Sequence, residues 1–134
     1  MTAGFLDTNV LIYAFSSDPR ALKAEELLSG EFVTSVQGLN EFANVARRKL
    51  GMSWEEVRLA LASIRTLAAS VQPLTLETHD MALDLVQRHD VSLFDGLMLA
   101  AALQADCSTF WSEDMLDGMV IEQQLTVTNP FAEH

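Results

Sequence analysis

The sequence predicts an α/β fold with a mainly parallel central sheet. Two observations support this class: short apolar runs alternate along the chain with longer segments of helical periodicity, and no repeat or obvious linker interrupts the alternation. Hydrophobic residues make up 49% of the 134 positions and charged residues 20%, which suits a folded chain with a sizeable core. We therefore expect a single domain over residues 1–134.

Five short apolar runs are predicted strands. They cover residues 3–6, 32–34, 71–74, 109–111 and 125–127. Each run has three or four residues, is rich in apolar or β-branched side chains and is bounded by polar residues, which is typical of short strands buried in a sheet.

Six segments show the apolar spacing or the capping signals of helices. They cover residues 10–15, 19–28, 37–50, 53–67, 76–89 and 94–105. The first helix follows three polar residues, 7–9, any of which could be its N-cap. Pro19 suits the start of the second helix, and Ser53 with Glu56 forms a capping-box pattern at the start of the fourth.

The formal net charge of −11 opposes direct binding of nucleic acid, because proteins that bind phosphate are usually basic. Divalent cations could offset this by bridging an acidic cluster to phosphate. The basic residues could also be concentrated locally, and Arg47, Arg48 and Lys49 form one such run. We treat this run as a candidate RNA-binding surface, with a solvated helix face as the alternative. The charge would equally favour a basic protein partner or serve solubility alone.

Compartment and redox chemistry follow from what the sequence lacks. No apolar run approaches the ~20 residues needed to span a bilayer, and the first ten residues have no basic region of the kind found in signal peptides. The single cysteine, Cys107, excludes an internal disulfide and a cysteine metal cluster. We therefore expect a cytoplasmic protein without a membrane partner.

Two of the 19 acidic residues are marked out by their positions. Asp7 directly follows the first predicted strand, and ligands of open α/β sheets bind outside the carboxyl ends of strands. A helix N-cap explains Asp7 equally well. Asp95 lies beside the apolar stripe of its predicted helix, where a carboxylate loses hydration unless a cation or hydrogen-bond donors compensate. The alternative for Asp95 is a first-turn residue favoured by the helix dipole.

Two further acidic positions are less distinct. Asp114 follows the fourth predicted strand, again at a carboxyl end, but Glu113 and Asp117 are close by and a turn residue is the alternative. Glu41 lies away from the main apolar stripe of its helix, and spacing alone would make it a solvated glutamate.

Taken together, the sequence resembles the PIN-domain family, and within it the VapC-type toxins of bacterial toxin–antitoxin pairs. Four ordered pieces spread over nearly the whole chain carry the resemblance. They are residues 5–13 with Asp7-Thr8-Asn9, residues 37–42 with Asn40-Glu41-Phe42, residues 92–95 with Asp95 followed by small residues at 100–102, and residues 110–115 with Ser112-Glu113-Asp114. One Asp-Thr-Asn would be a weak signal, but four pieces in order are a specific one.

The resemblance implies a three-layer α/β/α sandwich around a mainly parallel sheet. It implies that Asp7, Glu41, Asp95 and Asp114 meet in one acidic pocket that binds Mg²⁺ or Mn²⁺. It also implies endoribonuclease activity on an RNA substrate, a small antitoxin protein as partner, and a homodimer.

Other polar positions also match the family. Asn9 and Ser112 stand where the family has polar residues that support the pocket. Asp117 is close enough to the fourth piece to replace Asp114 as a metal ligand.

The chemistry of crowded carboxylates agrees with a metal site. Each carboxylate raises the proton affinity of its neighbours, so such a cluster stays ionised only around cations, and oxygen ligands select hard ions such as Mg²⁺ or Mn²⁺. We expect Asp7 and Asp95 to bind the metal directly or through water. Glu41 is a candidate for holding a metal-bound water or acting as general base, and Asp114 for completing this site or forming a second one.

Two other functions were weighed against the ribonuclease. An aspartate-nucleophile phosphatase could also place Asp7 at a strand end, but it would normally need an acidic residue in place of Asn9 and a suitably placed lysine, and the only lysines are Lys23 and Lys49. A non-catalytic binding module would keep the fold without its chemistry. The presence of all four acidic residues argues against that module.

Overall fold

A six-stranded sheet forms the centre of the computed structural model, which describes residues 3–132. Its strands are β1 (Gly4–Leu6), β2 (Phe32–Ser35), β3 (Ser70–Gln72), β4 (Thr109–Trp111), β5 (Val120–Ile121) and β6 (Leu125–Thr128). They lie in the order β3-β2-β1-β4-β6-β5, and only the β5–β6 pair is antiparallel. The sheet is therefore mainly parallel, as the sequence predicts.

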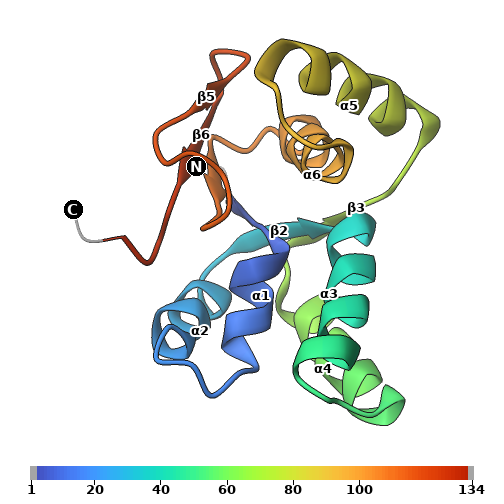
Figure 1. The fold of residues 1–134 in the computed structure, drawn as a ribbon, viewed down its shortest axis with the longest axis vertical. Coiled ribbons are helices and arrows are strands. Elements are labelled where there is room, and N and C mark those ends of the chain that lie inside the picture. Colours follow the sequence, from blue (N-terminus) through green and yellow to red (C-terminus); the bar gives the residue numbers. More distant parts are fainter. Residues whose placement is uncertain (1–2, 133–134) are drawn as a thin grey trace.

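Helices cover both faces of this sheet (Figure 1). They are α1 (Thr8–Ala14), α2 (Ala21–Ser29), α3 (Val36–Lys49), α4 (Trp54–Leu67), α5 (Leu76–His89) and α6 (Leu93–Gln104). The first four pack on one face and α5 with α6 on the other (Figure 1). The predicted three-layer α/β/α sandwich is confirmed.

The alternation of side chains along the strands supplies both apolar layers. In β1, Phe5 faces the α5–α6 side and stacks on Phe110 of β4, with ring centroids 5.2 Å apart. Leu6, its neighbour in the chain, faces the α1–α4 side. In β2, Phe32 and Val33 divide in the same way. A strand flanked on both faces must be apolar throughout, which explains why these short runs were recognisable in the sequence.

Element boundaries differ from the predictions by more than one residue in three elements. Helix α1 begins at Thr8 because Asp7 is its N-cap. Helix α2 begins at Ala21, since Pro19 lies in a turn where the Asp18 carboxylate accepts a hydrogen bond from the backbone N–H of Arg20. Strand β3 lies slightly earlier than the predicted residues 71–74.

One strand, β5, was not predicted. Its two residues are too short for a periodic pattern, and the turn to β6 has positive φ at Glu122 (50°) and Gln123 (57°). Such turns are usually signalled by Asn or Gly, which are absent at these two positions.

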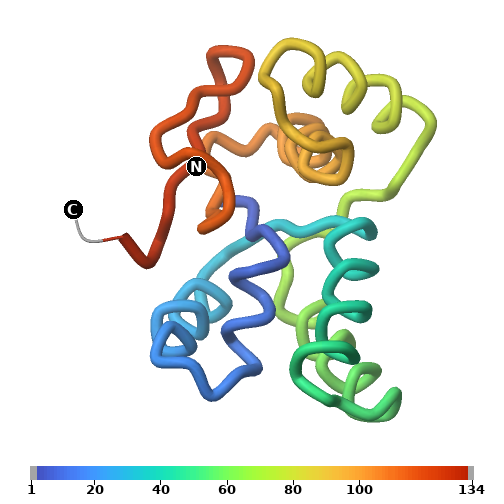
Figure 2. Tube along the Cα trace, viewed as in Figure 1, coloured from blue at the N-terminus to red at the C-terminus, as the bar shows by residue number. Residues whose placement is uncertain are grey.

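The order of the strands places β1, the first strand in the chain, in the interior of the sheet. The blue strand β1 lies between the cyan β2 and the orange β4 (Figure 2). Leu6 of β1 pairs with Trp111 of β4, and the N–H of Asp7 donates to the carbonyl of Trp111. The residues that follow these two parallel strands therefore leave the sheet side by side. None of the helices between residues 3 and 132 has both the length and the apolar character needed to cross a membrane.

Candidate active site

A pocket of about 540 Å³ opens at the carboxyl ends of β1 and β4. All four acidic residues predicted to meet there line it, each supplied by a different part of the fold. Asp7 follows β1, Glu41 lies on α3, Asp95 is in the first turn of α6, and Asp114 follows β4. The structure thus brings together residues that are separated by up to about a hundred positions in the chain.

Asp7 is the most buried of the four, with 4% of its surface exposed. Its Oδ1 accepts the N–H of Thr8 at 2.7 Å, which caps α1, and its Oδ2 accepts the hydroxyl of Ser112 at 2.7 Å. The pKa of Asp7 is raised to about 7, mainly by burial and further by the nearby carboxylates of Asp95 and Asp114, against the effect of these hydrogen bonds. Without a cation, Asp7 is therefore poised to gain a proton near neutral pH.

Asn9 and Ser112 connect Asp7 to Asp114. The Asn9 amide nitrogen donates to Asp7 Oδ2 at 3.2 Å and to Asp114 Oδ2 at 3.1 Å. The Ser112 hydroxyl donates to Asp7 and accepts the backbone N–H of Asp114 at 3.2 Å. The two residues predicted to support the pocket therefore link both of its strand-end carboxylates.

Glu41 and Asp95 are only partly buried. Burial is the main reason why the pKa of each is raised, and the carboxylate of Asp114 raises both further. Gln37, one helical turn before Glu41, donates its amide to Glu41 Oε2 at 3.2 Å. The charge of Asp114 thus acts on Glu41 and Asp95, although the three residues come from separate elements.

Asp114 and Asp117, the two candidates for the fourth acidic position, lie in different places. Asp114 lines the pocket and bonds to Asn9. Asp117 is absent from the residues lining the pocket, and its Oδ1 accepts the backbone N–H of Asn129 at 2.9 Å. The geometry therefore favours Asp114 at this position.

The pocket has the donor chemistry of a hard-cation site but is not a closed cage. Among residues 3–132, no three His, Cys, Asp or Glu side chains stand close enough together to hold a metal ion as they are placed. The Asn9 amide lies between Asp7 and Asp114, as its two hydrogen bonds show. The carboxylate oxygens nevertheless suit Mg²⁺ or Mn²⁺, and a cation would offset the repulsion between neighbouring carboxylates. The hydroxyl of Thr8, which also lines the pocket, is buried without a hydrogen-bond partner in the described part of the chain.

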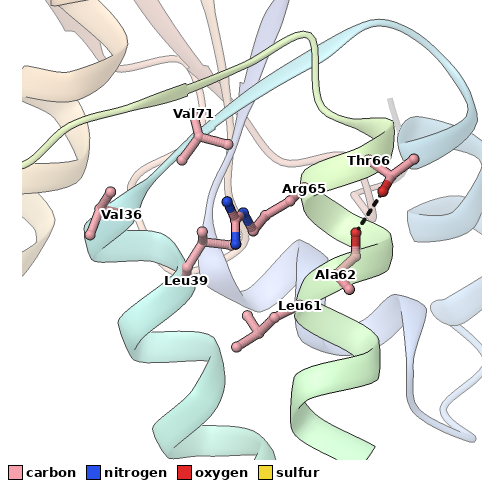
Figure 3. A pocket seen from close by; sticks show the side chains of 7 residues that line it. All are labelled: Val36, Leu39, Leu61, Ala62, Arg65, Thr66 and Val71. Carbon is pink, nitrogen blue, oxygen red and sulfur yellow. Dashed lines mark hydrogen bonds between the residues drawn. The ribbon is translucent and has the colours of Figure 1, made fainter.

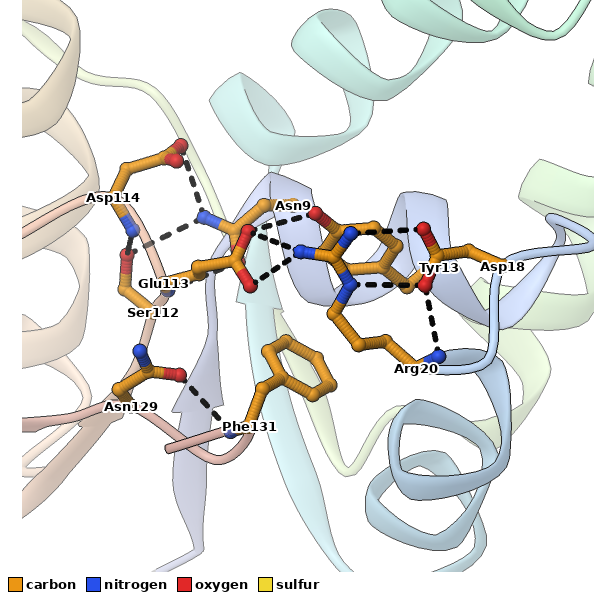
Figure 4. A network of polar contacts seen from close by, with 9 residues as sticks. All are labelled: Asn9, Tyr13, Asp18, Arg20, Ser112, Glu113, Asp114, Asn129 and Phe131. Atoms are coloured by element: carbon orange, nitrogen blue, oxygen red, sulfur yellow. Dashed lines mark hydrogen bonds and ion pairs between the residues drawn. The ribbon is translucent and has the colours of Figure 1, made fainter. Parts of the chain in front are cut away.

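A cluster of contacts around Arg20, next to the pocket, was not predicted from the sequence (Figure 4). Arg20 makes paired contacts with Asp18 at 2.9 Å and with Glu113 at 2.9 and 3.2 Å, and its guanidinium lies 4.4 Å from the centre of the Tyr13 ring. The Tyr13 hydroxyl donates to Glu113 at 2.7 Å. Glu113, one residue before Asp114, is therefore held by a cation and a phenol. Residues so far apart in the chain carry no shared spacing signal.

The basic run of α3 divides among three surroundings. Lys49 lines the acidic pocket, and Arg48 lines a neighbouring cavity. Arg47 donates to the carbonyl of Met52 at 3.0 Å and lies over the Trp54 ring at 4.8 Å, so it secures the α3–α4 turn. The three basic residues therefore have different neighbours, and their predicted contact with RNA stays a prediction.

A larger groove of about 870 Å³ lies elsewhere, between α3, α4 and β3 (Figure 3). It is lined by Val36, Leu39, Leu61, Ala62, Arg65, Thr66 and Val71. Among residues 3–132, no carboxylate lines it, and the Thr66 hydroxyl donates to the carbonyl of Ala62 at 2.9 Å. The smaller acidic pocket is therefore the better candidate for catalysis.

Three solved structures have a fold similar to that of this chain. The VapC20 toxin of Mycobacterium tuberculosis, described as cleaving the sarcin-ricin loop, superimposes with a TM-score of 0.67 at 22% identity over 81% of this chain and 87% of that chain. A toxin–antitoxin complex from Klebsiella pneumoniae gives 0.72 at 20% identity over 96% and 98%. VapBC2 from Rickettsia felis, bound to a DNA fragment from its promoter, gives 0.62 at 15% identity over 84% and 89%.

No curated protein sequence matches the chain. The family model of the PIN domain, however, matches residues 4–116, which include all four acidic residues of the pocket. This match covers well over half of the 134 residues, and the sequence resemblance is confirmed: the chain belongs to the PIN domain family.

Proposed function

We propose that this protein is a divalent-metal-dependent endoribonuclease. The observation that carries the proposal is the convergence of Asp7, Glu41, Asp95 and Asp114, from four separate parts of the fold, on one pocket, where burial and the carboxylate of Asp114 raise the pKa values of the other three. Clustered carboxylates with perturbed pKa values mark functional sites more often than structural ones.

Mg²⁺ or Mn²⁺ is the proposed cofactor. Asp7 and Asp95 would hold the ion directly or through water, with Glu41 and Asp114 as further ligands or as holders of a bound water. When bound, such an ion supplies Lewis acidity toward a phosphodiester and lowers the pKa of water.

The chain's own residues orient this site. Ser112 and Asn9 donate hydrogen bonds to Oδ2 of Asp7, while Oδ1 accepts the N-cap hydrogen bond from Thr8. Glu41 is the proposed general base, because its partly buried carboxyl has a raised pKa and therefore a greater affinity for a proton. Lys49, on the rim of the pocket, is placed to attract phosphate to an otherwise acidic surface.

The biological role that we propose is that of a toxin in a toxin–antitoxin pair. The similar folds include a toxin that cleaves the sarcin-ricin loop and two toxin–antitoxin assemblies, and this similarity supports the role. We propose RNA as substrate, a small antitoxin as inhibitor, a homodimer as the assembly and the cytoplasm as the location. A negative pocket would attract a basic side chain from such an inhibitor.

The test is cleavage of a random-sequence RNA pool by purified protein in Mg²⁺, Mn²⁺ or EDTA. We expect EDTA to abolish cleavage and Asp7→Asn to reduce its rate by roughly 10²- to 10³-fold, because the variant removes a charge at the reacting centre. Asp117→Asn is the matched control, since Asp117 lies outside the pocket and Asn keeps its acceptor oxygen. Equal cleavage by wild type and Asp7→Asn would contradict the proposal.

A further inference from the structure

A second cavity, of about 430 Å³, adjoins the acidic pocket. It is lined by Gln37, Asn40, Glu41, Asn44, Val45, Arg48 and Phe94. Glu41 and Val45 line both cavities, so the two are continuous across one face of α3. A strand of RNA bound in the acidic pocket would therefore extend past this surface.

The helical spacing of its polar residues builds one side of this cavity. Gln37, Asn40, Asn44 and Arg48 follow one another at intervals of three or four residues, the spacing that lines up side chains on one helix face. With a rise of 1.5 Å per residue, this row extends about 16 Å along α3. Glu41 lies on the same helix, so one of the four proposed reacting carboxylates and the amides are carried by one rigid element.

Phe94 supplies the opposite side. It is 59% exposed, although it directly precedes Asp95 in the first turn of α6. Most of the other phenylalanines are buried, for example Phe5, Phe42 and Phe110, each with none of its surface exposed. An aromatic ring presented to solvent beside a proposed reacting carboxylate offers a π-face to a planar ligand.

The polar groups of this cavity have unused binding capacity. No side chain in the described part of the chain bonds to the amides of Asn40 and Asn44 or pairs with Arg48, and all three residues are exposed. An amide can donate and accept at once, which matches the edge of a nucleobase, and a guanidinium matches phosphate.

We propose that this cavity binds an unpaired nucleobase of the RNA substrate next to the bond that is cut. Phe94 stacks on the base, Asn40 and Asn44 bond to its edge, and Arg48 contacts an adjacent phosphate. The proposal rests on the ribonuclease function above and adds a subsite for one base, with base preference set by the α3 amides.

A surface that binds a protein partner would have a different composition from the lining of this cavity. The cores of protein interfaces are apolar and poor in charge, whereas this cavity holds three amides, a carboxylate and a guanidinium around a single aromatic ring. The lining favours a ligand that is flat on one face and polar at its edges.

The test uses the Asp7→Asn protein, so that bound RNA stays uncut, and fluorescein-labelled short oligo(A), oligo(C) and oligo(U) measured by anisotropy. We expect Phe94→Ala and Phe94→Leu to weaken binding of the preferred oligomer by about 5- to 100-fold, and Phe94→Tyr to retain it, because stacking needs the ring and not the apolar area. Leu22→Ala is the matched control, an exposed apolar residue on α2 that lines neither cavity.

A second readout separates base recognition from general affinity. In an otherwise wild-type chain, Asn40→Ala and Asn44→Ala should change the base found at a fixed position beside the cut when the ends of a cleaved random RNA pool are sequenced. A purely structural role would slow cleavage without changing that distribution.

Three outcomes would overturn the nucleobase site. The first is tight binding by Phe94→Leu, and the second is absence of saturable binding of any oligomer to the Asp7→Asn protein. The third is a change of oligomeric state in the Phe94 variants, seen by light scattering, that accounts for their weaker binding. The last would identify a protein contact. If oligomer binding depends on Phe94 but the wild-type protein cuts no RNA, the base-binding site is supported and the ribonuclease function is refuted.

Discussion

At the scale of single residues, Asp7 shows how one side chain serves both the fold and the pocket. The sequence left two interpretations open, a helix cap or a site carboxylate. The structure confirms the cap and leaves the second interpretation open as a prediction, because Oδ1 caps α1 while Oδ2 accepts from Ser112 and Asn9 beside the pocket. The two interpretations were never exclusive, since a carboxylate has two oxygens.

The raised pKa of Asp7 predicts how stability depends on pH. The folded pKa of about 7 lies above 3.8, the ordinary value of an aspartate, so the folded state binds this proton more tightly and its stabilising effect is lost as pH rises through about 7. In EDTA, we expect the thermal midpoint of the wild type to fall between pH 5 and pH 8, and that of Asp7→Asn to fall less.

Circular dichroism melts at both pH values would check this. Glu25→Gln, on the exposed surface of α2, is the control and should keep the wild-type slope. Parallel slopes for wild type and Asp7→Asn would mean that Asp7 ionises in the fold as it does in the unfolded chain.

The local sequence pattern pointed to some of the acidic residues of the pocket and not to others. Asp7 and Asp95 could be proposed from a strand end and from an apolar neighbourhood. Glu41 could not, because it lies off the main apolar stripe of α3 and is partly buried only by the elements that pack around it. Contacts between distant segments leave no trace in local spacing, and only the family resemblance indicated Glu41.

At the scale of elements, the packing of α6 against α5 positions Asp95. The two helices meet at Gly96, where an added Cβ would lie 3.0 Å from the carbonyl oxygen of Ala82 and 3.1 Å from Val86 Cγ2. Gly96 directly follows Asp95. Its lack of a side chain therefore lets the first turn of α6 approach α5 while the carboxylate faces the pocket.

We expect Gly96→Ala to destabilise the fold more than Gly38→Ala does. At Gly96 the obstacle is backbone, and such overpacking costs about 1–3 kcal/mol, more than the roughly 1 kcal/mol of helix propensity gained. At Gly38 the close atoms belong to side chains, Thr34 Oγ1 and the flexible end of Met98, which can shift. Urea unfolding of both variants gives the comparison, and a smaller loss for Gly96→Ala would refute the steric argument.

Elements with many residues were predictable, and those defined by a turn were not. Periodicity located α3 and α5 within a residue or so of their ends because 14 residues repeat a pattern several times. Strand β5 has only two residues, and its extended conformation depends on pairing with β6. Its own sequence is too short to predict a strand.

At the scale of the whole molecule, charge and fold meet in the acidic pocket. A net charge of −11 opposes compaction, and four carboxylates around one pocket concentrate that cost. Any cation bound there in the folded state alone stabilises the protein by mass action.

We therefore expect Mg²⁺ to raise the thermal midpoint of the wild type, by an amount equivalent to about 2.7 kcal/mol at a concentration one hundred times the dissociation constant. The variant carrying both Asp7→Asn and Asp95→Asn should show little of this gain. NaCl at the same ionic strength controls for screening. An equal shift in the double variant would place the bound ion outside the pocket.

The pairing of β1 with β4 has a consequence for synthesis of the protein. Asp7 leaves the ribosome early, yet its bond to Ser112 joins residues 105 positions apart, and Asp114 comes later still. A nascent or truncated chain that lacks β4 cannot complete the acidic pocket, however well its first helices form. If the chain is the ribonuclease proposed above, its activity would depend on the last third of the sequence, and incomplete copies would be inactive.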